Sequence, residues 1–252
     1  MDVSLASDQI SASLALGKPL PKHVAIIMDG NRRWLKQRRH LCCEGKTSGH
    51  YYGVQVLPKI VSSAVTLGIK VLTLFVFSTE NFSRSQEEVR ELFLLFHSQL
   101  GKQLPFLMNQ GVRLRCIGDL SKLPQNIQEQ ITHAEKQTEN SSCLELVLAI
   151  NYGAKDELVR AFKKLHYDLT RQKISSEDLS ESLVGSYLDT AGLSDPDLLI
   201  RTGGEMRVSN FLLWQIAYTE LYVTEVLWPD FTPQHFIDAI KVYQQRSRRG
   251  GK

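Results

Sequence analysis

Cysteines, long apolar runs and leader-like segments are scarce or missing in this sequence. There are four cysteines in 252 residues, Cys42, Cys43, Cys116 and Cys143. None forms a Cys-x-x-Cys pair or has the spacing of a zinc site, which indicates free thiols in a reducing compartment. The longest apolar-rich run, residues 71–77, is too short to cross a bilayer, and the N-terminus lacks the basic segment and apolar core of a signal peptide. We therefore expect a cytoplasmic protein, with peripheral contact to the inner membrane surface left open.

The excess of charge of either sign is also small. Lysine and arginine together number 30 and aspartate and glutamate 27, a net charge of +3. Binding to nucleic acid through charge requires a basic cluster, and single strands also require stacking aromatic residues. The sequence has neither, so we expect no nucleic-acid partner. Its 42% hydrophobic and 23% charged content is that of an ordinary globular protein.

A short apolar segment at residues 24–28 is followed directly by Asp29, Gly30, Asn31, Arg32, Arg33 and Trp34. Such an unbroken apolar run predicts a strand buried on both faces, as in a parallel sheet. Open α/β sheets bind ligands where their strands end. A carboxylate suits Mg2+ and arginines suit phosphate, so the segment indicates a diphosphate site. A plain turn with solvated arginines explains this segment equally well.

Strand and helix patterns alternate along the whole chain without an internal repeat or a linker-like gap. This alternation predicts one α/β domain with about six mainly parallel strands flanked by helices. We expect a flexible arm at residues 1–22 and the domain at residues 23–252. The expected strands are 24–28, 71–77, 112–117, 144–150, 198–200 and 221–223, and the expected helices are 51–67, 85–108, 124–138, 154–165, 211–218 and 231–243.

Two more of these strands end in polar residues. The strand at 71–77 is followed by residues 78–84, and the strand at 198–200 by residues 201–210. In the second segment Gly203 and Gly204 let backbone amides approach an anion closely, and two arginines and a serine supply donors. The sequence therefore predicts a second phosphate cradle.

The long helix expected after Ser85 has a wider apolar arc than one packing face requires. Ser85 and Glu88 have the spacing of a capping box. Leu94, Leu95, Phe106 and Leu107 lie outside the stripe formed by Val89, Leu92, Phe93, Phe96, Leu100 and Leu104. Burial between the sheet and a neighbouring helix explains the arc, and so does a cavity for an apolar ligand.

Taken together, the motifs resemble the cis-prenyltransferases, and most closely the bacterial undecaprenyl diphosphate synthases, also called isoprenyl transferases. The resemblance covers residues from 23 to about 249. It rests on residues 29–34, 49–50, 77–81, 84, 151–153, 201–205, 207–211, 214–215 and 220. It implies an α/β domain with an apolar tunnel and a Mg2+-dependent enzyme. Such an enzyme adds isopentenyl diphosphate repeatedly to an allylic diphosphate such as farnesyl diphosphate, which produces the polyprenyl lipid carrier of cell-wall synthesis.

The resemblance also implies residue roles. Asp29 and Asn81 are the expected catalytic residues, and Asp29 and Glu220 the expected metal ligands. The expected substrate contacts are Gly30, Asn31, Arg32, Arg33, Trp34, Lys46, His50, Ser78, Thr79, Glu80, Phe82, Arg84, Arg201, Arg207, Val208 and Ser209. Asn81 stands where a proton acceptor is often placed in the family. An amide is a poor base, so we expect Asn81 to orient groups and the departing diphosphate to accept the proton.

Three departures from the family pattern affect these expectations. Phe82 replaces a common Trp and keeps an aromatic wall. Lys46 stands where an arginine is usual, in a segment a few residues longer than in typical relatives; it supplies charge but not a bidentate fork, which Arg38 or Arg39 can supply instead. Met206 replaces a His sometimes placed near the metal, so it is not counted as a ligand.

The family implies a homodimer, and we expect its interface near residues 211–230. Arg248, Arg249 and Gly250 resemble a C-terminal element that can reach the partner subunit's site. Two other functions are considered. A non-catalytic partner subunit would not need Asp29 and Asn81, and an anion-binding or nucleic-acid-binding module would bind without turnover. The length of the product does not follow from the sequence.

Overall fold

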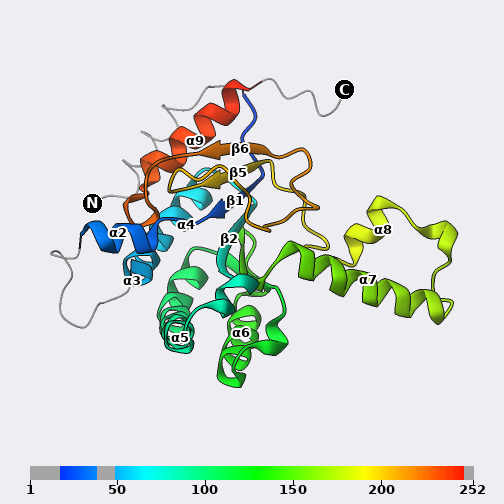
Figure 1. Ribbon diagram of the computed structural model, residues 1–252. Coiled ribbons are helices and arrows are strands. Elements are labelled where there is room, and N and C mark those ends of the chain that lie inside the picture. Colours follow the sequence, from blue (N-terminus) through cyan, green and yellow to red (C-terminus); the bar gives the residue numbers. More distant parts are fainter. Residues whose placement is uncertain (1–17, 39–48, 247–252) are drawn as a thin grey trace.

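A sheet of six parallel strands organises the computed structural model, which describes residues 18–38 and 49–246 (Figure 1). The strands are β1 (His23–Ile27), β2 (Val71–Ser78), β3 (Val112–Ile117), β4 (Leu144–Tyr152), β5 (Leu198–Arg201) and β6 (Glu220–Val223). Their order in the sheet is β3-β4-β2-β1-β5-β6. The expected α/β class with a parallel sheet is confirmed. Most of the predicted N-terminal arm, residues 1–17, lies outside the described residues.

Strand β1 lies at the centre of the sheet, between β2 and β5. Ile27 is level with Phe75 of β2 and Arg201 of β5. All five residues of β1 are buried, because the sheet is covered on both faces. Burial on both faces explains why this part of the sequence is an unbroken apolar run. The carboxyl ends of β1, β2 and β5 therefore lie side by side.

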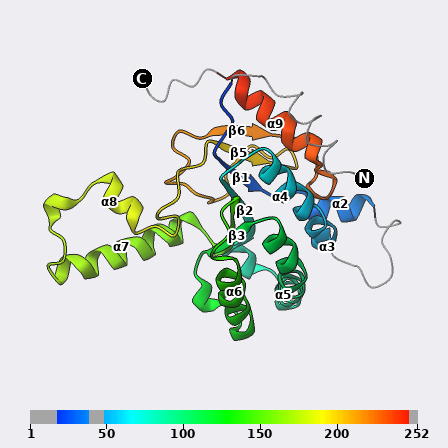
Figure 2. The ribbon, with the colours of Figure 1, turned by 180° about the vertical axis from the view of Figure 1, so that it is seen from behind.

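Helices connect and cover the strands (Figures 1 and 2). They are α2 (Asn31–Gln37), α3 (Gly49–Val54), α4 (Leu57–Thr66), α5 (Gln86–Asn109), α6 (Gln125–Thr138), α7 (Ala154–Thr170), α8 (Glu181–Ser186) and α9 (Pro233–Gln245), with short 3-10 helices at Thr79–Ser83, Leu120–Lys122, Ser176–Asp178 and Trp228–Asp230. Among residues 18–38 and 49–246, no helix is both long and apolar enough to cross a membrane.

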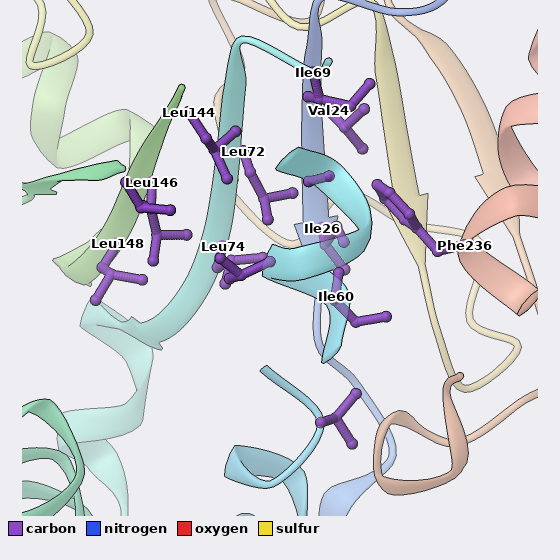
Figure 3. Packing of buried hydrophobic residues seen from close by; sticks show 14 of the residues in the cluster. Val24, Ile26, Ile60, Ile69, Leu72, Leu74, Leu144, Leu146, Leu148 and Phe236 are labelled. Atoms are coloured by element: carbon purple, nitrogen blue, oxygen red, sulfur yellow. The ribbon is translucent and has the colours of Figure 1, made fainter. Parts of the chain in front are cut away.

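The two faces of the sheet are covered differently. On one face, α4, α5, α6 and α9 pack against side chains such as Ile26, Leu72 and Leu74, and Figure 3 shows part of this larger core. On the other face, a smaller core contains Phe211 and Leu212, together with Tyr152 of β4. Of the helices of the larger core, α4 and α5 also line the cavity described below.

The single helix expected at residues 51–67 is in fact two helices. Helix α3 ends at Val54 and α4 begins at Leu57, with Pro58 in its first turn. A proline has no N–H, and its ring clashes with the carbonyl four residues earlier, here that of Val54. Continuous helix through this position would therefore be strained, and the break was visible in the sequence.

The helix expected at residues 211–218 does not form. Ser209, Asn210 and Leu212 have left-handed backbone conformations, with φ of 50°, 60° and 48°. Left-handed residues cannot continue a right-handed helix. The segment forms successive turns instead, and Phe211 and Leu212 are fully buried in the smaller core. Its apolar composition reflects burial and not helix.

Candidate active site

The polar segments that follow β1, β2 and β5 meet at the carboxyl edge of the sheet, where they line one end of a cavity of about 360 Å3. The three segments are far apart in the sequence, and the parallel register brings them together. The polar residues lining the cavity are Asp29, Asn31, His50, Ser78, Asn81, Arg84, Arg201 and Ser209, together with Gln99 and Gln103 of α5. The first eight were predicted from the sequence as site residues, and the two glutamines were not.

Asp29 is held at this edge by donors on several sides. Its Oδ1 accepts a hydrogen bond from the Gly30 amide at 2.6 Å, and its Oδ2 accepts one from Arg201 Nη2 at 2.8 Å. The guanidinium of Arg33 lies 3.5 Å from Oδ1. The Asp29 carbonyl accepts from the Thr202 hydroxyl at 2.7 Å. The carboxylate is thus fixed between the two predicted phosphate cradles.

Arg201 links Asp29 to the second cradle. It is only 5% exposed. Besides its bond to Asp29, it donates to the Ser209 hydroxyl at 2.8 Å and to the Arg207 carbonyl. Its Nε is buried and has no hydrogen-bond partner. A buried arginine with an unused donor beside a cavity is suited to bind an anionic ligand.

Glycines let the backbone of the two cradles approach closely. Gly203 has a φ of +85°, and a Cβ there would lie 2.5 Å from Arg33 Nη2. Gly49 precedes His50, and a Cβ at Gly49 would lie 2.0 Å from the Asn31 carbonyl oxygen. Side chains at these positions would force the segments apart, so the geometry of the site requires glycine at both.

Asn81 stabilises the turn after β2. Its Oδ1 accepts from the Ser78 amide at 3.1 Å, and the Ser78 side chain accepts in return from the Asn81 backbone. The carboxylate of the preceding residue, Glu80, accepts a hydrogen bond from Asn210 Nδ2 at 2.8 Å. Asn81 therefore holds the turn that follows β2, and Glu80 ties that turn to the segment that carries Ser209.

His50 is half-buried beside the basic residues of the site. Burial, aided by the charge of Arg84 and opposed by Glu88, lowers the pKa of His50 to about 4. At neutral pH its imidazole is therefore uncharged. An uncharged imidazole can donate or accept a hydrogen bond to a ligand without adding another positive charge.

The apolar part of the cavity lies between the sheet, α4 and α5. Helix α5 contributes Leu92, Phe93, Leu95, Phe96, Leu100, Phe106 and Leu107 to the lining. From Leu92 to Leu107 these residues extend over roughly 22 Å of helix. The wide apolar arc seen in the sequence therefore includes a cavity wall, and both Leu95 and Leu100 lie on it.

Trp34 does not line the cavity, and its predicted role as a substrate contact stays a prediction. It is 8% exposed, and its indole donates to Asp230 Oδ1 at 2.9 Å. Its ring packs against that of Tyr52, with centroids 4.7 Å apart. Trp34 is the buried side chain of the short helix α2, so these contacts fix the position of the helix.

Glu220 lies at the wrong edge of the sheet to share a metal with Asp29 of the same chain. It is level with Leu198, which is level with Val24 at the start of β1. Asp29 is five residues further along, or roughly 16 Å. The Glu220 carboxylate instead accepts from Arg246 at 2.6 Å. Asp29 and Glu220 of one chain therefore do not form one metal site, and the prediction that each of them binds metal stays a prediction.

The other predicted contacts lie around the cavity or beyond it. The side chains of Arg33 and Arg207 are exposed near Asp29 and Ser209, and Arg32 is also exposed. Val208 packs partly into the smaller core, and Phe82 lies on the outer surface of α5. Thr79 donates to Glu80 at 3.1 Å. Lys46, with Arg39 and the residues from Arg248 to Gly250, lies outside the described residues.

Comparison with known proteins identifies the family and the fold. A sequence model of the family described as "Putative undecaprenyl diphosphate synthase" matches residues 27–251. The chain belongs to this family of cis-prenyltransferases. An isoprenyl transferase of Chlamydia pneumoniae is 66% identical over 250 residues, which are 99% of this chain and 100% of the relative. An isoprenyl transferase of Geobacillus kaustophilus is 46% identical over 250 residues, 99% of this chain and 94% of the relative.

Solved structures agree with this assignment. The prenyltransferase matches lavandulyl diphosphate synthase from Lavandula x intermedia, in complex with dimethylallyl diphosphate, with a TM-score of 0.87 and 36% identity over 92% of this chain and 99% of that one. It matches a probable undecaprenyl diphosphate synthase from Campylobacter jejuni with a TM-score of 0.76 and 37% identity over 93% of this chain and 99% of that one. The protein is therefore a prenyl-group transferase.

The prenyltransferase site can hold Mg2+ only if a bound diphosphate supplies some of the ligands. Among the described residues there is no cluster of three or more His, Cys, Asp or Glu side chains that could hold a metal. Mg2+ is commonly bound by one or two carboxylates together with substrate phosphates and water. Asp29 uses two of about four carboxylate lone-pair sites on Gly30 and Arg201, which leaves acceptor capacity for a cation. Asp29 thus fits as the protein ligand of a Mg2+ that also binds a diphosphate.

Glu205 is a member of the prenyltransferase site that our sequence analysis did not assign. Its carboxylate is 3.8 Å from Arg33 Nη1 and 2.5 Å from Arg207 Nη1. It therefore bridges the arginines of the two cradles. The run from Arg201 to Glu205 marked it as part of a motif, but only the fold shows that Arg33 lies beside it.

Proposed function

We propose that the protein condenses isopentenyl diphosphate repeatedly onto an allylic diphosphate, with Mg2+ bound at Asp29, to form a long-chain polyprenyl diphosphate with cis double bonds. We further propose farnesyl diphosphate as the primer and an undecaprenyl-type lipid carrier for cell-wall synthesis as the product. One observation carries the proposal. Asp29 and Arg201 join two basic segments at the polar end of an apolar cavity.

The two basic segments would bind different substrates. Arg32 and Arg33, with Asn31 and His50, are suited to the allylic diphosphate, because its apolar chain can extend from them into the cavity. Arg201, Arg207 and Ser209 are suited to the diphosphate of isopentenyl diphosphate. Asp29 lies between the two groups, which supports a single reaction centre between two anionic substrates.

Charge development in the reaction matches the distribution of donors. The allylic C–O bond breaks, and its electron pair leaves with the diphosphate. The arginines stabilise this developing negative charge, and a bound Mg2+ would supply Lewis-acid stabilisation of the same phosphate oxygens. The double bond of isopentenyl diphosphate forms the new C–C bond, and a proton is then lost. Asn81 cannot act as a strong base, so it orients the groups and the released diphosphate accepts the proton.

The apolar cavity would hold the growing chain. The leucine and phenylalanine side chains on α5 would limit the access of water to the allylic cation, which water would otherwise convert into an alcohol. The lavandulyl diphosphate synthase matched above was solved with dimethylallyl diphosphate. That complex supports an allylic diphosphate at the corresponding site, so dimethylallyl diphosphate is a second primer to test.

We also propose that the active form is a homodimer. Helices α7 and α8 form an arm that extends away from the sheet in both views (Figures 1 and 2). Phe162 on this arm is 55% exposed and Val159 51% exposed. In the region expected from the sequence, Tyr218 is 80% and Leu221 47% exposed. Grouped exposed apolar side chains of this size are typical of interfaces.

The decisive experiment is an elongation assay on the purified full-length chain alone. It contains Mg2+, labelled isopentenyl diphosphate, and farnesyl or dimethylallyl diphosphate, and the products are sized by chromatography. We expect a series of products ending at one long chain, loss of synthesis with a chelator, and recovery with added Mg2+. No elongation by the chain alone would overturn the proposal in favour of a partner-subunit role. Anion binding without turnover and with a steep salt dependence would favour a binding module.

A further inference from the structure

Helix α5 has a second lined face besides the one that borders the main cavity. Residues 86, 89, 90, 93, 94 and 97 follow helical spacing and form one stripe. With Phe82, Arg84, and Pro124, Asn126 and Ile127 at the start of α6, this stripe lines an outer groove of about 450 Å3. Four apolar side chains of α5 lie outside its main stripe. Leu94 is the one of these four that does not line the main cavity, and it lines the outer groove instead.

The outer groove combines exposed apolar side chains with one exposed arginine, Arg90, that is in no ion pair within the described part of the chain. Leu94 is 60% exposed and Phe82 41% exposed. Arg90 has no ion-pair partner among the described residues, and Arg84 pairs with Glu88. No acidic side chain is among the described residues that line the groove. The groove therefore fits a ligand with an apolar body and a negatively charged head.

The start of α6 adds to the positive potential of the outer groove. This 14-residue helix has no acidic residue in its first turn and no side-chain cap at its N-terminus. The partial positive charge of a helix N-terminus is then left for an outside anion. The apolar groove, the unpaired Arg90 and this helix end all favour the same ligand chemistry.

The outer groove and the main cavity are separated by aromatic rings. Phe93 lines both, and so does Arg84. The Phe93 ring lies 5.1 Å from that of Phe77 and 6.0 Å from that of Phe82, between ring centroids. A molecule in the groove would thus touch the same ring as an apolar chain in the cavity.

We propose that the outer groove binds anionic phospholipid at a membrane surface, with the lipid phosphate at Arg90 and apolar lipid chains against Leu94 and Phe82. The groove is open on the outside of α5, where a bilayer can reach it, and a prenyl transferase makes an apolar product that belongs in a bilayer. Contact at the groove places Phe93, the wall of the product cavity, next to the lipid. Binding to lipid does not depend on the substrates proposed above.

The test is co-sedimentation of the full chain with sucrose-loaded vesicles of phosphatidylglycerol and phosphatidylcholine, with pure phosphatidylcholine vesicles for comparison. We expect binding to the anionic vesicles only. Arg90→Gln and Leu94→Gln should each lower the partition coefficient about fivefold, as expected for one basic group or one apolar contact at an anionic surface. Lys102→Gln removes an equal charge from an exposed position of α5 that lines neither the groove nor the cavity, and it should retain most of the binding.

Two results would overturn the proposal. The first is that the wild-type chain does not bind anionic vesicles. This result overturns the proposal even if soluble farnesyl monophosphate binds in a way that depends on Arg90. The second is an equal loss of vesicle binding in Arg90→Gln and Lys102→Gln, which would show general attraction to the surface. Because vesicle binding requires no turnover, its failure is distinguishable from failure of the proposed reaction.

Discussion

Asp29 and Arg201 form the contact on which the site depends. They are 172 positions apart in the sequence, and their side chains meet at 2.8 Å. Since Arg201 is almost fully buried, it needs this carboxylate as a counter-ion as well as a functional partner. Residue chemistry alone identified both as site residues, but not that they are paired.

Asp29→Asn tests the central carboxylate. We expect elongation kcat to fall at least roughly 100-fold, because the charge that would hold Mg2+ is lost. The amide keeps the shape of the side chain, so far-ultraviolet circular dichroism should be unchanged. Asp238→Asn, an exposed carboxylate paired with Lys241 on α9, is the control and should retain full activity. Substantial activity in Asp29→Asn would contradict the proposed metal role.

Asn81 offers a second test at the scale of single residues. An aspartate at position 81 can still accept the bond from the Ser78 amide, whereas an alanine cannot. Asn81→Asp should therefore retain turnover, and Asn81→Ala should lose roughly 10- to 100-fold, the range expected for a lost hydrogen bond that holds a turn. Full activity of Asn81→Ala in the elongation assay would remove this residue from the mechanism.

Among the elements, α5 borders two hollows. One side lines the main cavity and the other lines the outer groove. A helix between a sheet and a neighbouring helix also needs apolar residues on two sides, so its sequence pattern does not distinguish packing from cavities. The distinction depends on how α4 and α6 are placed against it.

Leu95→Trp tests the cavity wall of α5. The larger ring should fill part of the cavity and shift the products to shorter chains, as chromatography of the extracted lipids would show. Leu94→Trp is the matched control, because this neighbouring side chain points outward and lines no part of the main cavity. Its products should keep the wild-type length. Equal lengths from wild type and Leu95→Trp would mean that α5 does not limit the chain.

Strand β1 begins with a buried histidine that makes stability depend on pH. His23 Nδ1 lies 2.6 Å from the Ser194 carbonyl and Nε2 2.7 Å from the Thr73 hydroxyl. A carbonyl can only accept, so Nδ1 carries the proton of the neutral ring. Burial, opposed by the Ser194 carbonyl and Asp197, lowers the pKa of His23 to about 4.

The sign of this pH dependence follows from the lowered pKa. The pKa of His23 in the unfolded chain is 6.5. Above this pH, His23 is neutral in both the folded and the unfolded chain, so it does not change the free energy of unfolding. As the pH falls towards 4, the unfolded chain binds a proton first, so the free energy of unfolding decreases. We expect His23 to contribute a loss of about 2 kcal/mol between pH 7 and pH 5. Urea unfolding at both pH values should show it, and His23→Asn should reduce the difference by that amount; an identical difference in the variant would contradict this.

At the scale of the whole molecule, the exposed arm is a surface on which the proposed homodimer depends. Helix α7, which contacts α8, buries Ala161 and Leu165 and leaves Phe162 and Val159 exposed. Its attachment includes Arg160, which donates two hydrogen bonds to Asp189 at 2.7 and 2.6 Å. The arm is therefore held firmly enough to present a defined apolar surface.

Phe162→Glu tests the proposed dimer. A charge in the centre of an apolar interface should convert the dimer to a monomer, which light scattering coupled to size exclusion would detect. Lys163→Glu, the neighbouring change at an exposed position, is the control and should remain dimeric if that residue lies outside the interface. A wild-type chain that is monomeric at micromolar concentration would contradict the proposal.

The sequence by itself determined the strands of the sheet and which polar residues follow them. Strands buried on both faces must be continuous apolar runs, and polar residues can follow only where such strands end. Asp29, Asn81 and Arg201 could therefore be placed at strand ends without a structure. The helix cap at Ser85 was also predicted from the sequence, and it is confirmed, since the Ser85 hydroxyl accepts a hydrogen bond from the Glu88 amide.

Only the tertiary structure decided which strand ends meet and which polar residues stay apart. The strand order brings β1 beside β5, so Asp29 pairs with Arg201, and the same parallel register leaves Glu220 at the far edge. Trp34 and Phe211 are apolar for packing, and nothing in their local sequence shows which surface they cover. These outcomes depend on long-range contacts, which local propensity and periodicity do not contain.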